Sequence, residues 1–216
     1  MRIVFLGPPG AGKGTQAARM AGRFGVEHAS TGEIFRRAAA EGSELGRTVK
    51  DYLDGGKLVP DELTSQVVER MVIETAAGYI LDGYPRTLQQ GHDLEQMLRR
   101  RGEQLDLVVY YELGEQEAER RLTGRIVCAE CGANYHEQFM PPQAEGICDA
   151  CGGPLHRRSD SSPEVVRKRL EEYRQKTEPL VRFYREQELL ETVDASAAPS
   201  AVEQVTEDLL RRLQSG

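Results

Sequence analysis

A glycine-rich loop that ends in Gly-Lys stands near the start of the chain, with the sequence Gly7-Pro8-Pro9-Gly10-Ala11-Gly12-Lys13-Gly14-Thr15. It follows the apolar run Ile3–Leu6 and precedes a helical pattern over Gln16–Phe24. The G-x4-G-K spacing is typical of a phosphate-binding loop, in which backbone N–H groups surround an anion and the lysine adds a cation. A turn that only joins strand to helix is the alternative, and the strand–loop–helix context disfavours it. We predict a phosphate site.

The loop departs from the usual pattern in one position. The hydroxyl residue that normally follows the lysine directly is replaced by Gly14, and a hydroxyl comes one residue later, at Thr15. Direct ligation of magnesium by Thr15 is therefore unsupported.

Four cysteines, all within one short segment, form a second candidate site. Cys128 and Cys131 make one Cys-x2-Cys pair, and Cys148 and Cys151 make another, with sixteen residues between the two pairs. Four thiolates at this spacing predict one tetrahedral zinc ion. Two disulfides are disfavoured in a reducing compartment, and a redox-active pair would leave the other pair without a role. Iron in place of zinc stays open.

Basic side chains near the predicted phosphate site form a third group. Most single arginines are solvated surface residues, and we interpret Arg167 in this way. Several converging arginines, however, suit phosphoryl transfer, because guanidinium groups match the spread of charge over phosphate oxygens. The candidates are Arg36, Arg86, Arg121, Arg125, Arg158 and Arg169.

Asp82 ends an apolar strand, and we interpret it as a carboxylate that holds magnesium through water; its alternative role is to cap the following turn. The four histidines show no metal spacing, and we interpret all four as surface or packing residues.

The elements that must position these residues alternate between strand and helix. Apolar runs predict strands over Ile3–Leu6, Val26–Ser30, Tyr79–Asp82, Leu107–Leu113 and Leu190–Asp194. Amphipathic spacing predicts further helices over Ser43–Leu53, Asp61–Thr75, Thr87–Arg101, Glu115–Thr123 and Ala201–Leu213, and one that begins at Ser162-Pro163. This order predicts a three-layer α/β fold with a five-stranded parallel sheet and helices on both faces. Ligands bind such sheets at the carboxyl ends of the strands, where the loop, Thr31 and Asp82 would meet.

Two segments interrupt the alternation, and we expect both to be mobile insertions. The expected core is formed by residues 1–29, 60–123 and 162–216. Residues 30–59 form the first insertion, and residues 124–161, which hold the cysteines, form the second. Pro179 lies within a helical pattern that it is expected to end or kink.

Composition limits the classes of function. The 216 residues carry a formal net charge of −7, which argues against bulk binding to nucleic acid or a membrane surface. No apolar stretch is long enough to span a bilayer, and the first residues do not resemble a signal peptide. We therefore expect a cytoplasmic protein.

The motifs closely resemble those of the adenylate kinase family over nearly the whole chain. The loop Gly7–Gln16 is similar to the family's P-loop, and Ser30-Thr31-Gly32-Glu33 with Arg36 is similar to its first contact with the nucleoside monophosphate, where aspartate is more usual than glutamate. Lys57–Asp61 resembles the base-contacting loop. Asp82-Gly83-Tyr84-Pro85-Arg86-Thr87 with Gln90 resembles the signature D-G-[FY]-P-R-T, and Arg121–Arg125 resembles the opening of the lid.

The resemblance implies magnesium-dependent transfer from ATP to AMP, giving two ADP, by a monomer with a structural zinc in its lid. ATP would contact Gly10, Ala11, Gly12, Lys13, Gly14, Thr15, Arg121 and Arg125. AMP would contact Thr31, Arg36, Leu58, Val59, Gly83, Arg86, Gln90, Arg158 and Arg169. The transferred group would be surrounded by Lys13, Arg86, Arg121, Arg125, Arg158 and Arg169. The chain departs from the family after Arg158, where Asp160-Ser161 stands in place of two aspartates.

Two other functions remain as alternatives. A kinase for UMP or CMP, or a GTP-dependent AMP kinase, would share the same motifs; Thr31 favours adenine at the acceptor, whereas no residue indicates the donor base as sharply. A zinc-ribbon protein that binds nucleic acid and carries a nucleotide switch is disfavoured by the acidic charge and by the absence of a stripe of aromatic and basic residues.

Overall fold

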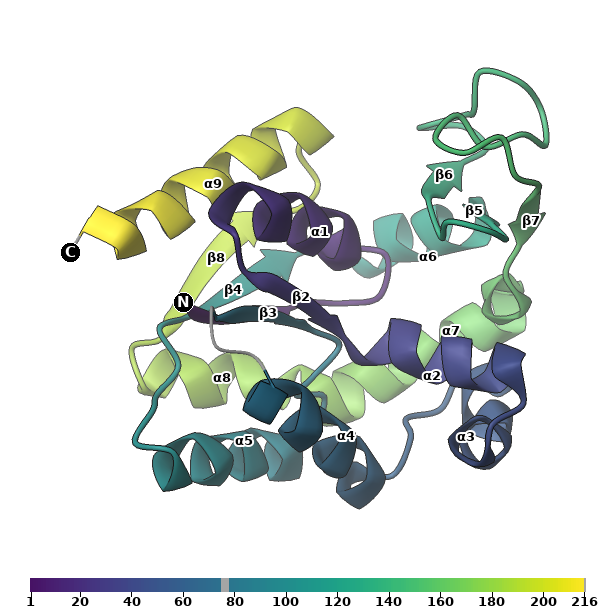
Figure 1. Cartoon of the computed structure of the whole chain (residues 1–216). Helices are drawn as coiled ribbons and strands as arrows, with labels where there is room; N and C mark the ends of the chain where they lie inside the picture. Colours follow the sequence, from purple (N-terminus) through teal and green to yellow (C-terminus); the bar gives the residue numbers. More distant parts are fainter. Residues whose placement is uncertain (75–77, 216) are drawn as a thin grey trace.

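The computed structural model describes residues 1–74 and 78–215, and a five-stranded sheet lies at its centre (Figure 1). Its strands are β1 (Arg2–Leu6), β2 (Glu27–Ser30), β3 (Tyr79–Asp82), β4 (Leu107–Glu112) and β8 (Leu190–Asp194). Their order is β2-β3-β1-β4-β8, and every pairing is parallel. The predicted parallel α/β fold is therefore confirmed, with strand ends within a residue of their expected positions.

Helices cover both faces of this sheet (Figure 1). Alternate residues of β1 point to opposite sides, so that Ile3 and Phe5 join one hydrophobic core and Val4 and Leu6 join the other. The first core is covered by α1 (Lys13–Phe24), α6 (Glu115–Thr123), α7 (Pro163–Glu172) and α9 (Pro199–Ser215); the second is covered by α4 (Asp61–Glu74), α5 (Leu88–Arg100) and α8 (Pro179–Glu186). The expected last residue of α4, Thr75, lies outside the described residues.

The carboxyl ends of three neighbouring strands meet at one edge of the sheet. Ser30 at the end of β2 is paired in register with Asp82 at the end of β3, and Phe5 of β1 is paired with the same aspartate from the other side. Because β1 runs directly into the glycine-rich loop, this edge brings together the loop, the start of α2 and Asp82.

Residues 31–54 fold as two helices with a small core of their own. These are α2 (Thr31–Glu41) and α3 (Glu44–Asp54), which begin after the serine caps Ser30 and Ser43. Phe35, Val49 and Val59 form their shared buried cluster. Of these two helices, α3 confirms the one predicted over Ser43–Leu53, with its ends shifted by one residue.

The cysteine segment contains three short strands that the sequence patterns do not predict. They are β5 (Arg125–Cys128), β6 (Asn134–His136) and β7 (Leu155–Arg157), and they form an antiparallel sheet in the order β6-β5-β7. Figure 1 shows this sheet projecting from the end of α6, away from the central sheet. Strands of three or four residues carry too few apolar positions to form a recognisable alternation.

The chain returns to the core through the 3₁₀ turn η1 (Ser159–Ser161) and α7, whose cap Ser162 accepts a hydrogen bond from Val165 N at 3.4 Å. A π-helical turn, η2 (Tyr173–Thr177), lies between α7 and α8, and α8 begins at Pro179. From the sequence, Pro179 is expected to end or kink the helix. In the structure, the helix widens into the π-helical turn before the proline, and α8 then begins at the proline itself. Within the described part of the chain, no helix is long and apolar enough to cross a membrane.

Candidate active site

The glycine-rich loop curls at the end of β1 and leads directly into α1. Gly12 has a left-handed backbone (φ +82°) and is the residue before the first helical turn, which begins at Lys13. A residue with a Cβ would be strained in this conformation. The free N–H groups at the start of α1 therefore face the interior of the loop, where they favour an anion.

Lys13 lies folded over this loop. Its Nζ donates hydrogen bonds to the carbonyl oxygens of Gly7 and Pro8, both at 2.8 Å. Burial, together with repulsion from the nearby Arg86, Arg125 and Arg169, lowers the pKa of Lys13 to about 8 against the opposing effect of Asp82. A phosphate in the loop would offer this ammonium a negatively charged partner in place of two neutral carbonyls.

Asp82 is held at the end of β3 by two neighbours on β2. Ser30 Oγ donates to Asp82 Oδ2 at 3.4 Å, and His28 Nε2 lies 3.5 Å from the same oxygen. Burial alone would raise the pKa of Asp82, but His28, Lys13 and Arg86 hold it below its usual range. The carboxylate is therefore ionised at neutral pH, as a ligand for a hydrated cation must be.

His28 lies next to the candidate site, which the sequence interpretation did not predict. It was expected to lie at the surface or to fill space, whereas its side chain is 14% exposed and faces Asp82. Burial lowers the pKa of His28, and the contact with Asp82 more than offsets this and raises it. No sequence signal indicates this contact, because it depends on the pairing of β2 with β3, in which Ser30 stands beside Asp82.

Three of the predicted arginines converge on a single carboxylate. Asp160 Oδ2 accepts hydrogen bonds from Arg158 at 2.6 Å and from Arg169 at 2.7 Å, and Asp160 Oδ1 lies 3.4 Å from Arg125. These side chains are all less than one-fifth exposed. Burial tends to raise the pKa of Asp160, but the three guanidinium groups hold it below its usual range.

Two further arginines contribute to the same positive field. Burial lowers the pKa of Arg36 to about 10, and Arg158 and Arg86 repel its charge. The pKa of Arg86 is also lowered, first by burial and then by repulsion from Arg158. All these groups remain protonated at neutral pH. We name the five arginines the arginine cluster: Arg36, Arg86, Arg125, Arg158 and Arg169.

Arg121 is the one predicted arginine that the structure does not bring into this cluster. Its Nε contacts Glu117 at 2.8 Å, and its NH1 donates to the carbonyl oxygen of Ala195 at 2.9 Å. It therefore lies on the side of the loop after β8. Arg167 is exposed, as interpreted from the sequence.

The predicted acceptor residues gather around the turn after β3. The carbonyl oxygen of Gly83 accepts from Thr31 Oγ1 at 2.9 Å and from Arg86 Nε at 2.8 Å. Gln90 is buried, and its Oε1 accepts from the backbone N–H of Arg86 at 2.7 Å. Val59 is buried in the core of the two-helix segment, and Leu58 beside it is partly exposed.

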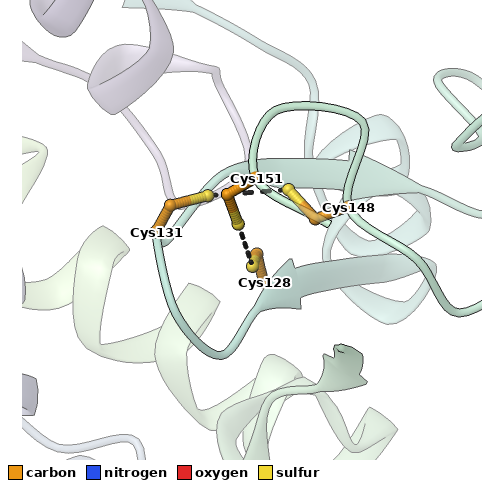
Figure 2. Close-up of side chains that lie close together, drawn as sticks. All are labelled: Cys128, Cys131, Cys148 and Cys151. Carbon is orange, nitrogen blue, oxygen red and sulfur yellow. Dashed lines mark hydrogen bonds between the residues drawn. The ribbon is translucent and has the colours of Figure 1, made fainter. Parts of the chain in front are cut away.

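The four cysteines come together at the tip of the three-stranded sheet (Figure 2). Their sulfur atoms all lie within 4.8 Å of one another, and Cys128–Cys151 and Cys131–Cys148 are each 3.5 Å apart. None of the four forms a disulfide. A disulfide would need sulfur atoms about 2.05 Å apart, whereas a tetrahedral metal with bonds of about 2.3 Å separates its sulfurs by about 3.8 Å.

The surroundings of the cysteines also suit a metal. The hydrogen bond with the Tyr135 hydroxyl, at 3.4 Å, is the main reason that the pKa of Cys148 falls to about 6, whereas the neighbouring sulfurs contribute to raising the pKa of Cys131 and of Cys151. A thiolate is the form that binds metal. The set of four sulfur ligands is compatible with one zinc ion and leaves no open coordination position.

Comparison with known proteins agrees with this geometry. The sequence model of the adenylate kinase family matches residues 5–189. The chain is 47% identical to adenylate kinase from Moorella thermoacetica over 94% of each chain. It is 44% identical to the protein of that name from Fervidobacterium nodosum over 97% of each chain, and 42% identical to the one from Archaeoglobus fulgidus over 100% of each. The chain belongs to the adenylate kinase family.

The chain is accordingly a nucleotide-binding kinase that transfers a phosphoryl group from ATP to AMP, giving two molecules of ADP. The family also implies magnesium with the ATP. No observation favours the GTP-dependent alternative.

Proposed function

We propose that this chain transfers the terminal phosphoryl group of ATP directly and in line to the phosphate of AMP, without a covalent intermediate. The observation that supports this most strongly is the arginine cluster: Arg125, Arg158 and Arg169 gather on Asp160. Three members of the cluster, Arg86, Arg125 and Arg169, also act electrostatically on Lys13 of the glycine-rich loop. The acceptor is a phosphate oxygen, which is anionic near neutral pH, so no general base is required. Catalysis then comes from positioning and charge neutralisation.

On the donor side, the loop from Gly10 to Thr15 holds the phosphates of ATP with its backbone N–H groups. Lys13 exchanges its two carbonyl partners for phosphate oxygens. Arg125 contacts the transferred group. We assign Arg121, whose NH1 donates to the carbonyl oxygen of Ala195 in the structure, to the phosphates of ATP and to the transferred group.

On the acceptor side, Arg36, Arg86 and Arg169 hold the phosphate of AMP, and Arg158 lies between the two substrates. Thr31 and Gln90 contact the adenine, and Leu58 and Val59 line its pocket. Gly83 provides the backbone turn against which Thr31 and Arg86 are held.

Two metals complete the proposal. Asp82 fits a hydrated Mg²⁺, because it is an ionised oxygen donor next to the loop: a Cβ built on Gly14 would lie only 3.1 Å from Asp82 Oδ2. When bound with ATP, magnesium neutralises charge on the phosphates. Zinc on the four cysteines stabilises the fold of a segment whose own buried core is small.

The chain then works as a core with two insertions that exclude water from the reaction, which matters because water competes with AMP as acceptor. Residues 1–29, 60–123 and 162–216 form the core, residues 30–59 the AMP-binding insertion, and residues 124–161 the zinc-containing lid. We also propose that the enzyme is a cytoplasmic monomer.

The test is a coupled assay of ADP formation from ATP and AMP, repeated with UMP, CMP and GMP as acceptors and with GTP as donor. We expect ATP and AMP to give the highest kcat/KM. Lys13→Met is expected to lower kcat by several orders of magnitude with an unchanged thermal midpoint. A preference for another acceptor, or a near-normal rate for Lys13→Met, would refute the proposed roles.

A further inference from the structure

Asp61 makes contacts that none of the roles above explains. It is the first residue of α4, and its side chain is only partly exposed. Asp61 Oδ1 accepts a hydrogen bond from Gln90 Nε2 at 2.8 Å, and Asp61 Oδ2 accepts one from Thr87 Oγ1, also at 2.8 Å. Thr87 is the cap of α5 and accepts from the backbone N–H of Gln90 at 3.1 Å. One carboxylate thus holds both the first turn of α5 and the amide of Gln90.

The two partners of the Gln90 amide determine its orientation. An ionised carboxylate can only accept hydrogen bonds, so Asp61 requires the NH₂ group of the amide. The backbone N–H of Arg86 can only donate, so it requires the amide oxygen, from which it lies 2.7 Å. A flip of the amide would place donor against donor and acceptor against acceptor. Because Gln90 is 1% exposed, water could not easily compensate for those losses.

This arrangement leaves part of the hydrogen-bonding capacity of the amide unused among the described residues. Among the residues that the structure describes, Nε2 donates to Asp61 and Oε1 accepts from Arg86. An amide has two N–H donors and two acceptor positions, so one of each remains. The remaining donor and acceptor have fixed positions, since neither can be exchanged for the other.

Adenine and hypoxanthine differ in the feature that such an amide can distinguish. At carbon 6, adenine carries an amino group, which donates, whereas hypoxanthine carries a carbonyl oxygen, which accepts. Nitrogen 1 of adenine accepts, and that of hypoxanthine donates. Purine shape, ribose and phosphate are the same in AMP and IMP. An amide fixed in one orientation therefore fits one base and opposes the other, whereas an amide free to flip can fit either.

We propose that Asp61 is a positioning residue, which sets the preference for adenine by fixing the amide of Gln90. This inference rests on the proposed contact between Gln90 and the acceptor base. Asp61 itself does not touch the nucleotide. Its removal should therefore change the choice between acceptors and leave the use of ATP unaffected.

The experiment measures kcat/KM for AMP and for IMP at saturating ATP, with the KM for ATP and the thermal midpoint recorded for each variant. Asp61→Ala is expected to lower the AMP-to-IMP ratio about tenfold, since it removes a hydrogen bond to a charged acceptor. The change should lie mainly in the KM for AMP. Asp61→Asn keeps the size of the side chain and is expected to lower the ratio about threefold, because its neutral amide can present a donor or an acceptor to Gln90.

Glu62→Ala is the matched control. Glu62 is the other acidic residue in the first turn of α4 and is exposed, so its removal has a similar effect on the start of the helix. Its AMP-to-IMP ratio should equal that of the unmodified enzyme. An equal fall in Glu62→Ala would show that helix stability, and not the Gln90 amide, carries the effect, and would overturn the inference.

The Gln90→Ala variant separates the role of Asp61 in positioning the amide from the proposed contact of Gln90 with the base. If Gln90→Ala lowers the ratio and both Asp61 variants leave it unchanged, the role of Asp61 is refuted and the role of Gln90 stands. If Gln90→Ala leaves the ratio unchanged, the proposed base contact fails, and the inference fails with it. A fall in kcat/KM for AMP and IMP by the same factor in Asp61→Asn would mean that Asp61 only supports the fold.

Discussion

Asp160 should act as an internal counter-charge that the phosphates of the substrates replace, and Asp160→Asn tests this. The substitution keeps the shape of the side chain and removes its charge. It leaves Arg158 and Arg169, now 2.6 and 2.7 Å from the carboxylate, facing a neutral group. Asp160 is 13% exposed, so solvent screens these contacts only partly.

The size of the effect follows from the geometry. A hydrogen bond to a charged group contributes about 1.5–3 kcal/mol, and loss of one partner from a buried ion pair costs about 3–5 kcal/mol. Because the contacts are partly exposed and the asparagine oxygen still accepts one bond, we expect a loss of about 3 kcal/mol in the nucleotide-free protein. For a chain of this size, this lowers the thermal midpoint by about 6–12 °C.

The decisive assay compares thermal midpoints with and without a bisubstrate ligand, two adenosines joined by five phosphates. In Asp160→Asn, the ligand phosphates meet arginines that no carboxylate occupies, so the ligand should raise the midpoint more than it does in the unmodified enzyme. Glu164→Gln is the control, because Glu164 is 75% exposed and its ion pair is with the exposed Lys168. The midpoints of this variant should hardly change. A ligand-induced rise in Asp160→Asn that is equal to or smaller than the unmodified value would refute the replacement of Asp160 by phosphate.

The same variant has a defined dependence on pH. The pKa of Asp160 is lower in the folded protein than in the unfolded chain, so its stabilising effect is complete above the unfolded value, about 3.9. The effect is lost as the pH falls through the folded value. The difference in stability between the unmodified enzyme and Asp160→Asn should therefore be constant from pH 8 to pH 5 and should shrink below about pH 4.

Three further predictions concern the loop, the acceptor site and the metal. The pKa of Lys13 is about 8 without ligand, and a bound phosphate would raise it, so ATP should bind with proton uptake near pH 8 and more weakly as the pH rises above 8. Calorimetry in two buffers with different ionisation enthalpies measures the proton uptake, and the Lys13→Arg variant should show none. Arg86→Lys keeps the charge but loses the forked geometry, so the KM for AMP should rise at least about tenfold while that for ATP is spared; an equal rise in both would indicate a structural role. Metal analysis should find one zinc per chain, and chelation should lower the thermal midpoint and the transfer rate while ATP still binds; a chelated protein that has lost its whole fold, or a preparation without metal, would contradict this.

The central sheet and the chemistry at its edge could be predicted because each depends on a local pattern. Short apolar runs with glycine or charge at their ends predict buried parallel strands, and the loop from Gly7 to Thr15 has a spacing imposed by phosphate geometry. The four cysteines likewise carry their spacing in the sequence. In these cases the residues that act together lie close in sequence or repeat with a fixed period.

The contacts that could not be predicted join side chains from distant segments. His28 meets Asp82 only because β2 and β3 are neighbours in the sheet. Asp61 meets Gln90 only because α4 and α5 begin side by side. The strands of the cysteine segment pair with one another around only a small apolar cluster, so no alternating pattern marks them in the sequence. In each case tertiary packing decides the outcome.

The arginine cluster contains buried polar groups without partners, and the phosphates of the substrates should provide those partners. Asp160 contacts three guanidinium groups, but Arg125 Nε and Ser161 Oγ are both buried without a hydrogen-bond partner in the described structure. An aspartate at position 161 would add a second carboxylate near these groups, whereas serine adds no charge. Buried groups without partners lower stability, and a folded protein tolerates them where a ligand later provides the partner. Phosphate oxygens are suitable partners for guanidinium groups, so the nucleotide-free chain holds a site in which unpaired positive charge is ready for its substrates.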